Sequence, residues 1–191
     1  MKSSEFILTL ADLCKAKTCY ATGAFGAVVN LYNNRNRYMS NTSNKKVKEA
    51  IEKAPDGTFL YDCIGLGKSI LWGFNFNENL RYGGANYKSN DIPDFGVKSV
   101  KKYGEASSDF STVIAGEWLV NESEDHVGYY IGGGMYIDIS QTNKDYKVAV
   151  HNISERVWKY HCKMQWIDYE PDYGTVKCPH CGKEIKIYAT K

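Results

Sequence analysis

The sequence predicts an α+β fold in which helices come first and an antiparallel sheet follows. Apolar residues recur with a helical period between Ser4 and about Ala16, and a second apolar helix follows a capping residue at position 62. From Ser111 onward the chain consists instead of β-rich runs separated by turn residues. Helices grouped before strands are typical of α+β proteins.

The first half of the chain is interpreted as short helices joined by turns and loops. A glycine-punctuated turn covers residues 20–26, and residues 27–31 are expected to form another helical turn. The polar stretch 33–48 is expected to be an exposed loop, followed by a short charged helix over residues 46–52. A Pro-Asp-Gly turn at residues 55–57 then leads into the second helix.

The stretch 75–103 is rich in Asn, Gly, Tyr and Lys and shows little periodicity. A structureless stretch of this length is unusual unless it is functional, so it is a candidate cover for one side of a cleft, with short helices around residues 97–103. Three consecutive glycines at 132–134 predict a tight hairpin between two of the later β-rich runs. The expected strands cover residues 112–120, 126–131, 135–139, 146–153 and 165–169.

Cys63 is the first candidate for chemistry, because it follows a good N-cap residue, Asp62, at the start of the second helix. Leu66 and Ile70 give that helix an apolar face for packing. The unpaired amides and the positive dipole end at a helix N-terminus favour an anion, which lowers the pKa of a thiol. A free cysteine more often serves as a small buried hydrophobic residue, so a partner base elsewhere in the chain must decide.

Composition restricts the class of protein. With 191 residues, 43% hydrophobic and 24% charged, the chain suits one domain with a real core and shows no sign of global disorder. A formal charge of +2 argues against a nucleic-acid binder, and 15 Tyr and 4 Trp suit either a β-rich core or a surface for sugars or extended peptides. No stretch approaches the roughly 18 apolar residues of a membrane span. The N-terminus does not resemble a signal peptide, which predicts synthesis in the cytoplasm.

A histidine and an aspartate lie on the two strands of the expected hairpin. His126 lies six residues before Gly132 and Asp138 lies four after Gly134, so an antiparallel hairpin places them on neighbouring strands. A one-residue bulge decides whether they share a face. If they do, Asp138 can orient the imidazole and His126 can take the proton from Cys63, as in a Cys-His-Asp triad. Otherwise His126 is an ordinary strand-end histidine.

The order of these motifs resembles the NlpC family of bacterial cell-wall cysteine peptidases, which have a papain-like fold. The aromatic-and-glycine loop at 20–26 precedes Asp62-Cys63-Ile64-Gly65-Leu66, and a His-Val-Gly strand follows at 126–132. The closing segments 158–161 and 166–169 look like the final strand of the family. The resemblance runs from about residue 5 to 169.

The resemblance implies a papain-like domain over residues 1–170, with the nucleophile helix packed on the antiparallel sheet. It implies Cys63 as the nucleophile, His126 as the base and Asp138 as the third polar group. Tyr20 matches a tyrosine near the nucleophile and is a candidate oxyanion contributor; the alternative, that it is simply a core tyrosine, stays open. The family often has a histidine at the third position, and an acidic residue at that position makes this chain resemble the phage-encoded members.

The C-terminal tail, residues 171–191, contains the Cys-x2-Cys spacing of a zinc knuckle at Cys178 and Cys181. A structural zinc needs four ligands. A reduced thiol pair, or a ribbon that has lost its metal, is the alternative. The candidates for the other two zinc ligands are either Cys162 with His161 or Cys14 with Cys19. Catalysis itself is expected to need no cofactor.

Together these features predict a cysteine peptidase or amidase that cleaves amide bonds in peptidoglycan stem peptides or crossbridges, as a phage endolysin or virion-associated lysin. Its partners would be those peptides, with no nucleic acid and no membrane. It would act on the wall after lysis-related release or from a virion. Two alternatives stay open: an acyltransferase or amidase acting on lipid or small amide substrates, and a non-catalytic wall-binding protein.

Overall fold

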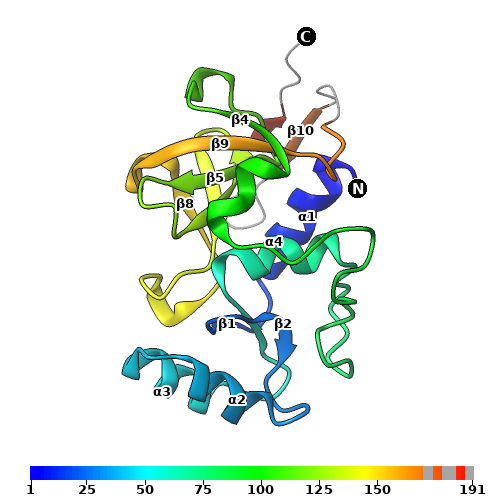
Figure 1. Cartoon of the computed structure of the whole chain (residues 1–191), viewed down its shortest axis with the longest axis vertical. Coiled ribbons are helices and arrows are strands. Elements are labelled where there is room, and N and C mark those ends of the chain that lie inside the picture. The colour runs from blue at the N-terminus through cyan, green and yellow to red at the C-terminus, as the bar shows by residue number, and fades with distance from the viewer. Residues whose placement is uncertain (170–173, 178–183, 188–191) are drawn as a thin grey trace. The chain divides into compact units, whose positions relative to one another are not determined.

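The computed structural model describes residues 1–169, 174–177 and 184–187, and they form an α+β fold, as predicted (Figure 1). The chain divides into two compact units, each assembled from separate segments. The first unit consists of Met1–Asp12, Phe95–Asp138 and Val150–Lys191, and the second of Leu13–Asp94 and Ile139–Ala149. The predicted boundary at residue 170 stays a prediction.

The first unit is built on a six-stranded sheet with the strand order β4-β9-β5-β6-β7-β8. The pairings from β4 through β7 are all antiparallel, and β9, the longest strand, lies between β4 and β5. A separate antiparallel pair is formed by β10 and β11. The strands are β4 (Gly104–Ser107), β5 (Trp118–Asn121), β6 (Val127–Gly132), β7 (Met135–Asp138), β8 (Ala149–Asn152), β9 (Trp158–Met164), β10 (Gly174–Lys177) and β11 (Glu184–Ile187).

Helix α1 (Ser3–Leu13) supplies the apolar face that covers this sheet. The Phe6 ring lies 6.4 Å from Trp118 and 5.6 Å from Tyr129, and all three side chains are fully buried. Burying each such side chain contributes about 1.5–3 kcal/mol, so this aromatic cluster anchors the unit. Three short 3-10 helices complete it: η1 (Val97–Lys102), η2 (Phe110–Thr112) and η4 (Ile153–Glu155).

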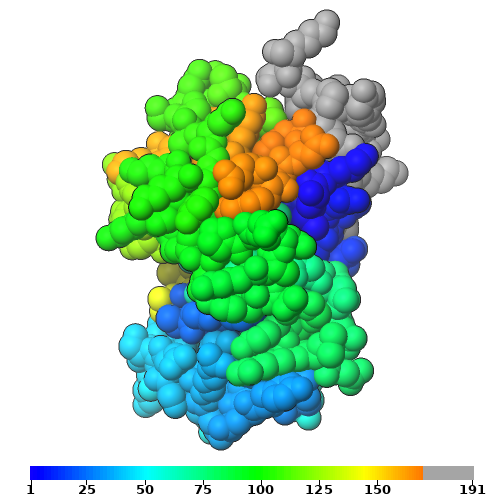
Figure 2. All heavy atoms as spheres, turned by 45° about the vertical axis from the view of Figure 1, so that its right-hand side comes forward, coloured from blue at the N-terminus to red at the C-terminus, as the bar shows by residue number. Residues whose placement is uncertain are grey.

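The second unit contains a three-stranded sheet with β3 at its centre, parallel to β1 and antiparallel to β2. Helix α3 is strongly amphipathic and buries Val47 and Ile51. In Figure 2 the green surface of the stretch 75–94 adjoins the blue surface that precedes α2, where Arg81 lies over the Tyr32 ring. The elements are β1 (Thr18–Tyr20), β2 (Phe25–Val28), α2 (Asn34–Asn41), α3 (Lys45–Lys53), β3 (Phe59–Tyr61), α4 (Cys63–Leu71) and η3 (Lys144–Tyr146).

Two predictions for the second unit are wrong. Residues 27–31 do not form a helical turn, because Ala27 and Val28 pair with Leu60 and Phe59 and extend β2. Tertiary pairing overrides a weak local preference here. The predicted loop 33–48 contains helix α2, which the polar composition concealed. Its buried Tyr38 anchors it to the unit.

Two strand predictions in the first unit also need correction. Of residues 112–120, only those from Trp118 onward form a strand, and Phe110–Thr112 is a 3-10 helix. The last long strand is β9, not residues 165–169, because pairing with both β4 and β5 fixes Trp158–Met164 in the sheet. Within the part of the chain that the structure describes, no helix is both long and apolar enough to cross a membrane.

Candidate active site

Cys63 is the first residue of helix α4 and is 8% exposed. The helix starts where the sequence predicts, because the Oδ1 atom of Asp62 accepts a hydrogen bond of 2.6 Å from the Gly65 amide. The thiol therefore lies at the positive end of the helix dipole, where an anion is favoured. This local geometry is compatible with a nucleophilic thiolate.

Asp62 also fastens the preceding glycine-rich loop to the helix. Its Oδ2 atom accepts a 2.8 Å hydrogen bond from the Gly23 amide, and its own amide donates to the Ala24 carbonyl. An added Cβ at Gly65 would lie 2.0 Å from that carbonyl oxygen, so only glycine fits there. Burial raises the pKa of Asp62, and the two amides and Lys68 oppose that effect.

Tyr20, at the end of β1, is electrostatically coupled to Cys63. Burial raises the pKa of its hydroxyl to about 12, and the charges of Cys63 and Asp62 add to the rise. The hydroxyl is therefore protonated at neutral pH and can donate a hydrogen bond. Its role as an oxyanion donor stays a prediction.

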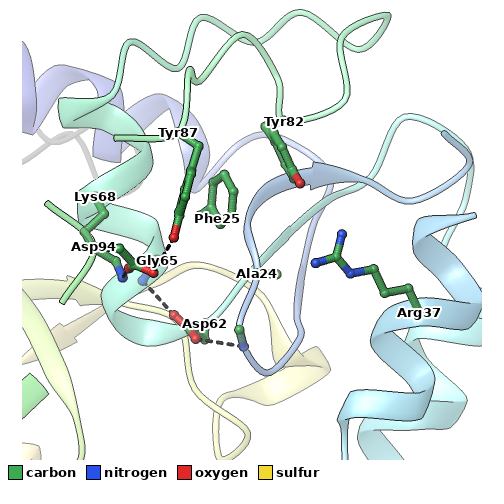
Figure 3. A pocket seen from close by; sticks show the side chains of 10 residues that line it. Ala24, Phe25, Arg37, Asp62, Gly65, Lys68, Tyr82, Tyr87 and Asp94 are labelled. Atoms are coloured by element: carbon green, nitrogen blue, oxygen red, sulfur yellow. Dashed lines mark hydrogen bonds and ion pairs between the residues drawn. The ribbon is translucent and has the colours of Figure 1, made fainter. Parts of the chain in front are cut away.

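A pocket of about 530 Å³ lies beside the start of α4, within the second unit (Figure 3). Aromatic rings form one wall, and the Phe25 ring lies 4.2 Å from that of Tyr82. Figure 3 shows Arg37 and Tyr82 on one side of the pocket, and Lys68, Tyr87 and Asp94 on the other. The lining residues are Gly23, Ala24, Phe25, Arg37, Asp62, Gly65, Lys68, Tyr82, Tyr87 and Asp94.

The two sides of the pocket differ in charge pairing. On one side Lys68 forms an ion pair with Asp94, whose other oxygen accepts a 3.0 Å hydrogen bond from the Tyr87 hydroxyl. Partial burial opposes the effect, but Lys68 and Tyr87 hold the pKa of Asp94 below its usual value. On the other side, Arg37 forms no ion pair with any carboxylate of the described residues. An anionic ligand group would therefore find an available guanidinium there.

In the first unit, His126 and Asp138 form a buried pair. The Nε2 atom of His126 lies 2.6 Å from the Oδ2 atom of Asp138, whose side chain is fully buried. A carboxylate accepts the Nε2 proton, which leaves Nδ1 of the ring as the basic nitrogen. Trp158 stacks at 6.3 Å and limits rotation of the imidazole.

A bulge in strand β6 brings the pair onto one face. Next to the turn Gly132 pairs with Met135, and the register then shifts by one residue at Ile131. On the far side of this bulge from the turn, Tyr129 lies opposite Ile137. Because side chains alternate along a strand, His126 and Asp138 then point to the same side of the sheet. Without the extra residue, Asp138 would oppose Tyr129 and His126 would point to the other side. The bulge thus decides the question that the hairpin spacing left open.

Sequence reasoning missed two cationic side chains beside this pair. The Nε2 atom of His151, in β8, lies 3.4 Å from Oδ1 of Asp138, and Nη2 of Arg156 lies 3.8 Å from Oδ2. The sequence did place His151 in an expected strand, 146–153. It could not show that this strand lies next to the one with Asp138, because tertiary structure sets the neighbours of a strand.

The predicted zinc site lies largely outside the described residues, since Cys178 and Cys181 both do. Among the residues that are described, no three His, Cys, Asp or Glu side chains gather as a metal site would require. Cys162 is buried in β9, and burial raises the pKa of its thiol to about 12, which disfavours the thiolate that zinc binds. His161 is paired with the buried Glu117. The zinc site stays a prediction.

The fold and these residues define an α+β protein with a cysteine at a helix N-terminus in one unit and a buried His-Asp pair in the other. The pairing of Cys63 with His126 would join the two units and stays a prediction.

Solved structures that resemble this chain include the two that follow. The peptidoglycan hydrolase RipB from Mycobacterium tuberculosis has 14% sequence identity and a TM-score of 0.47, covering 87% of this chain and 67% of RipB. NlpC1 from Trichomonas vaginalis has 18% identity and a TM-score of 0.41, covering 81% of this chain and 42% of NlpC1. No protein-family model and no curated protein matches the sequence.

Proposed function

We propose that the chain is a cysteine hydrolase that cleaves amide bonds in the peptides of peptidoglycan. Cys63 is the nucleophile, His126 the base and Asp138 the residue that orients it. The observation that carries the proposal is the 2.6 Å contact between His126 Nε2 and the buried Asp138 carboxylate, which leaves Nδ1 as the proton acceptor. The choice of peptidoglycan follows the order of motifs, which resembles the NlpC family.

The reaction follows the usual course for a thiol hydrolase. His126 takes the Cys63 proton on Nδ1, and the sulfur attacks the carbonyl carbon of the scissile amide. The C–N bond then breaks, and the imidazolium gives its proton to the leaving amine. His126 next deprotonates a water that attacks the thioester, which releases the carboxylic acid and restores the thiol. The Tyr20 hydroxyl and the Cys63 amide donate to the transient oxyanion.

The pocket beside α4 supports a charged peptide as the substrate. The Arg37 guanidinium suits a free carboxylate, and the Asp94 carboxylate, whose side chain is 40% exposed, suits an amide or amine. The rings of Phe25 and Tyr82 provide apolar contact between these groups. A stem peptide carries both kinds of polar group on a short backbone.

The test compares wild type with Cys63→Ala on purified cell walls, following released amines and identifying the muropeptides by mass spectrometry. We expect release by wild type and none by Cys63→Ala. Cys14→Ala, which removes a half-buried thiol outside helix α4, is the matched control and is expected to retain activity. Equal release by wild type and Cys63→Ala refutes the mechanism.

Two other outcomes would point to different functions. Hydrolysis of a small ester without any action on walls favours a lipid or small-amide acyltransferase or amidase. Binding to walls without hydrolysis, combined with ordinary reactivity of Cys63 toward iodoacetamide at neutral pH, favours a wall-binding protein.

The proposal extends to a role as an endolysin or virion-associated lysin, on the resemblance to phage-encoded members of the family. Protein added to cells with a permeabilised membrane is then expected to lyse them. A protein that digests purified walls but lyses no cells under those conditions contradicts this role.

A further inference from the structure

The Asp138 carboxylate is surrounded by more cationic groups than a simple His-Asp pair needs. It is fully buried, and among the described residues three side chains have a nitrogen within ion-pair distance of it: His126 at 2.6 Å, His151 at 3.4 Å and Arg156 at 3.8 Å. His126 directly precedes β6, His151 lies in β8, and Arg156 directly follows η4. A carboxylate removed from water is destabilised unless it is well paired, and a single imidazole does not supply that pairing.

His151 is held between two carboxylates. Its Nε2 atom faces Oδ1 of Asp138, and its Nδ1 atom lies 3.2 Å from Oε2 of Glu155. Glu155 is fixed in turn, because its Oε1 atom accepts a hydrogen bond from the Asn152 amide in a capping box. The pKa of His151 is raised, chiefly by Asp138 and further by Glu155, although partial burial opposes the rise.

Aromatic rings fix both cations beside Asp138. The Tyr136 ring stacks on His151 at 5.3 Å, and the Arg156 guanidinium lies 5.9 Å from the centre of the Trp158 ring. Trp158 also stacks on His126, so the same ring contacts the candidate base and one of the added cations.

This arrangement is not optimised for stability. The contact of His151 with Asp138 is long, at 3.4 Å, and the buried Nε atom of Arg156 has no hydrogen-bond partner among the described residues. A buried donor that is left unpaired lowers stability. Groups kept at that cost commonly serve a site.

We propose that His151 and Arg156 are positioning residues that keep the buried Asp138 carboxylate charged and aligned on Nε2 of His126. They act through Asp138 and touch neither the nucleophile nor the scissile bond in this scheme. The expected effect on kcat rests on the proposed function, whereas the expected effect on the tautomer of His126 does not. Within the described part of the chain, the charged and titratable groups that act on Asp138 include His126, Tyr136, His151, Glu155 and Arg156.

The structural consequence can be measured without any substrate. A charged Asp138 selects the tautomer of His126 that carries its proton on Nε2, and nitrogen-15 NMR of the imidazole distinguishes the two tautomers. The His126→Gln spectrum assigns the His126 signals among the four histidines of the chain. We expect the Nε2–H tautomer in wild type and a mixture of both tautomers in the double variant His151→Gln/Arg156→Gln.

The kinetic consequence is a lower kcat at unchanged KM. General-base catalysis contributes about 100- to 10,000-fold, so partial loss of the correct tautomer is expected to lower kcat about tenfold in the double variant. Arg156→Lys keeps the charge and is expected to retain most of the activity. Lys159→Gln, which removes an exposed ion pair with Glu124 in the same unit, is the matched control and is expected to behave as wild type.

A double variant that keeps both the Nε2–H tautomer and the wild-type kcat overturns the proposal. A wild type with the proton on Nδ1 overturns it as well. If the double variant does not fold, the single variants His151→Gln and Arg156→Gln, each of which keeps one of the two side chains, are measured in the same way. If wild type shows no hydrolysis at all, the proposed function fails, and the tautomer measurement still decides the positioning role.

Discussion

Replacing Gly65 by Ala is expected to destabilise the second unit, although alanine is the better helix former. An added Cβ would lie 2.0 Å from the Ala24 carbonyl oxygen and 2.8 Å from the Asp62 Oδ1 atom. The loop must therefore move away from α4, and the hydrogen bonds of Asp62 are strained. Such overpacking costs about 1–3 kcal/mol, and a 2.0 Å contact with a backbone oxygen belongs at the upper end, about 2–3 kcal/mol. The helix propensity of alanine returns at most about 1 kcal/mol, so we expect a net loss of about 1–2 kcal/mol.

The assay is thermal unfolding of the full chain followed by circular dichroism. For a chain of this length, 1 kcal/mol corresponds to about 2–4 °C, so Tm should fall by about 2–8 °C. Gly96→Ala is the control, because an added Cβ there meets no atom within 4 Å, and its Tm should not change. A Gly65→Ala variant at least as stable as wild type refutes the argument that the loop approaches the helix too closely for a side chain.

Four further predictions follow from the site. Arg37→Gln should raise KM for wall peptides about tenfold by removing a carboxylate partner, while Lys46→Gln, at an exposed residue that does not line the pocket, leaves KM unchanged. Tyr20→Phe should lower kcat about 100-fold with little change in Tm, and an unchanged kcat would exclude the oxyanion role. The fold raises the pKa of His151, so its stabilising contribution is fully present below its unfolded pKa and is lost as pH rises through its folded pKa. The Tm difference between wild type and His151→Gln should therefore shrink from pH 6 to pH 9. A Tm difference that does not change with pH contradicts this. If the tail holds zinc, metal analysis should find one equivalent in wild type and less in Cys178→Ser, and absence of zinc from wild type ends that idea.

The helix start at Cys63 could be predicted because the signals that fix it are local. Asp62 caps an amide three residues away, so the sequence alone contains both partners. The neighbourhood of His126 and Asp138 was also predictable, since a glycine hairpin joins their strands. The face they share was not, because it depends on the extra residue at Ile131, and nothing in the local sequence requires a bulge there.

The missed features all depend on distant partners. Residues 25–28 become a strand only because β3 offers an edge to pair with, some thirty residues later in the chain. His151 reaches Asp138 only because β8 lies next to β7 in the sheet. Arg37 and Tyr82 meet at one pocket from segments that the sequence separates widely. Periodicity contains no information on such pairings.

The alternation of the chain between the two units has a consequence for folding during synthesis. The last segment of the second unit ends at Ala149, whereas β5 of the first unit remains without its β9 neighbour until Trp158–Met164 has been made. We therefore expect the second unit, with Cys63, to become compact on the ribosome first, while the aromatic face around Trp118 is still incomplete. Nascent chains stalled so that Ala149, but not Trp158, has left the ribosome exit tunnel should show protease protection of the second unit alone.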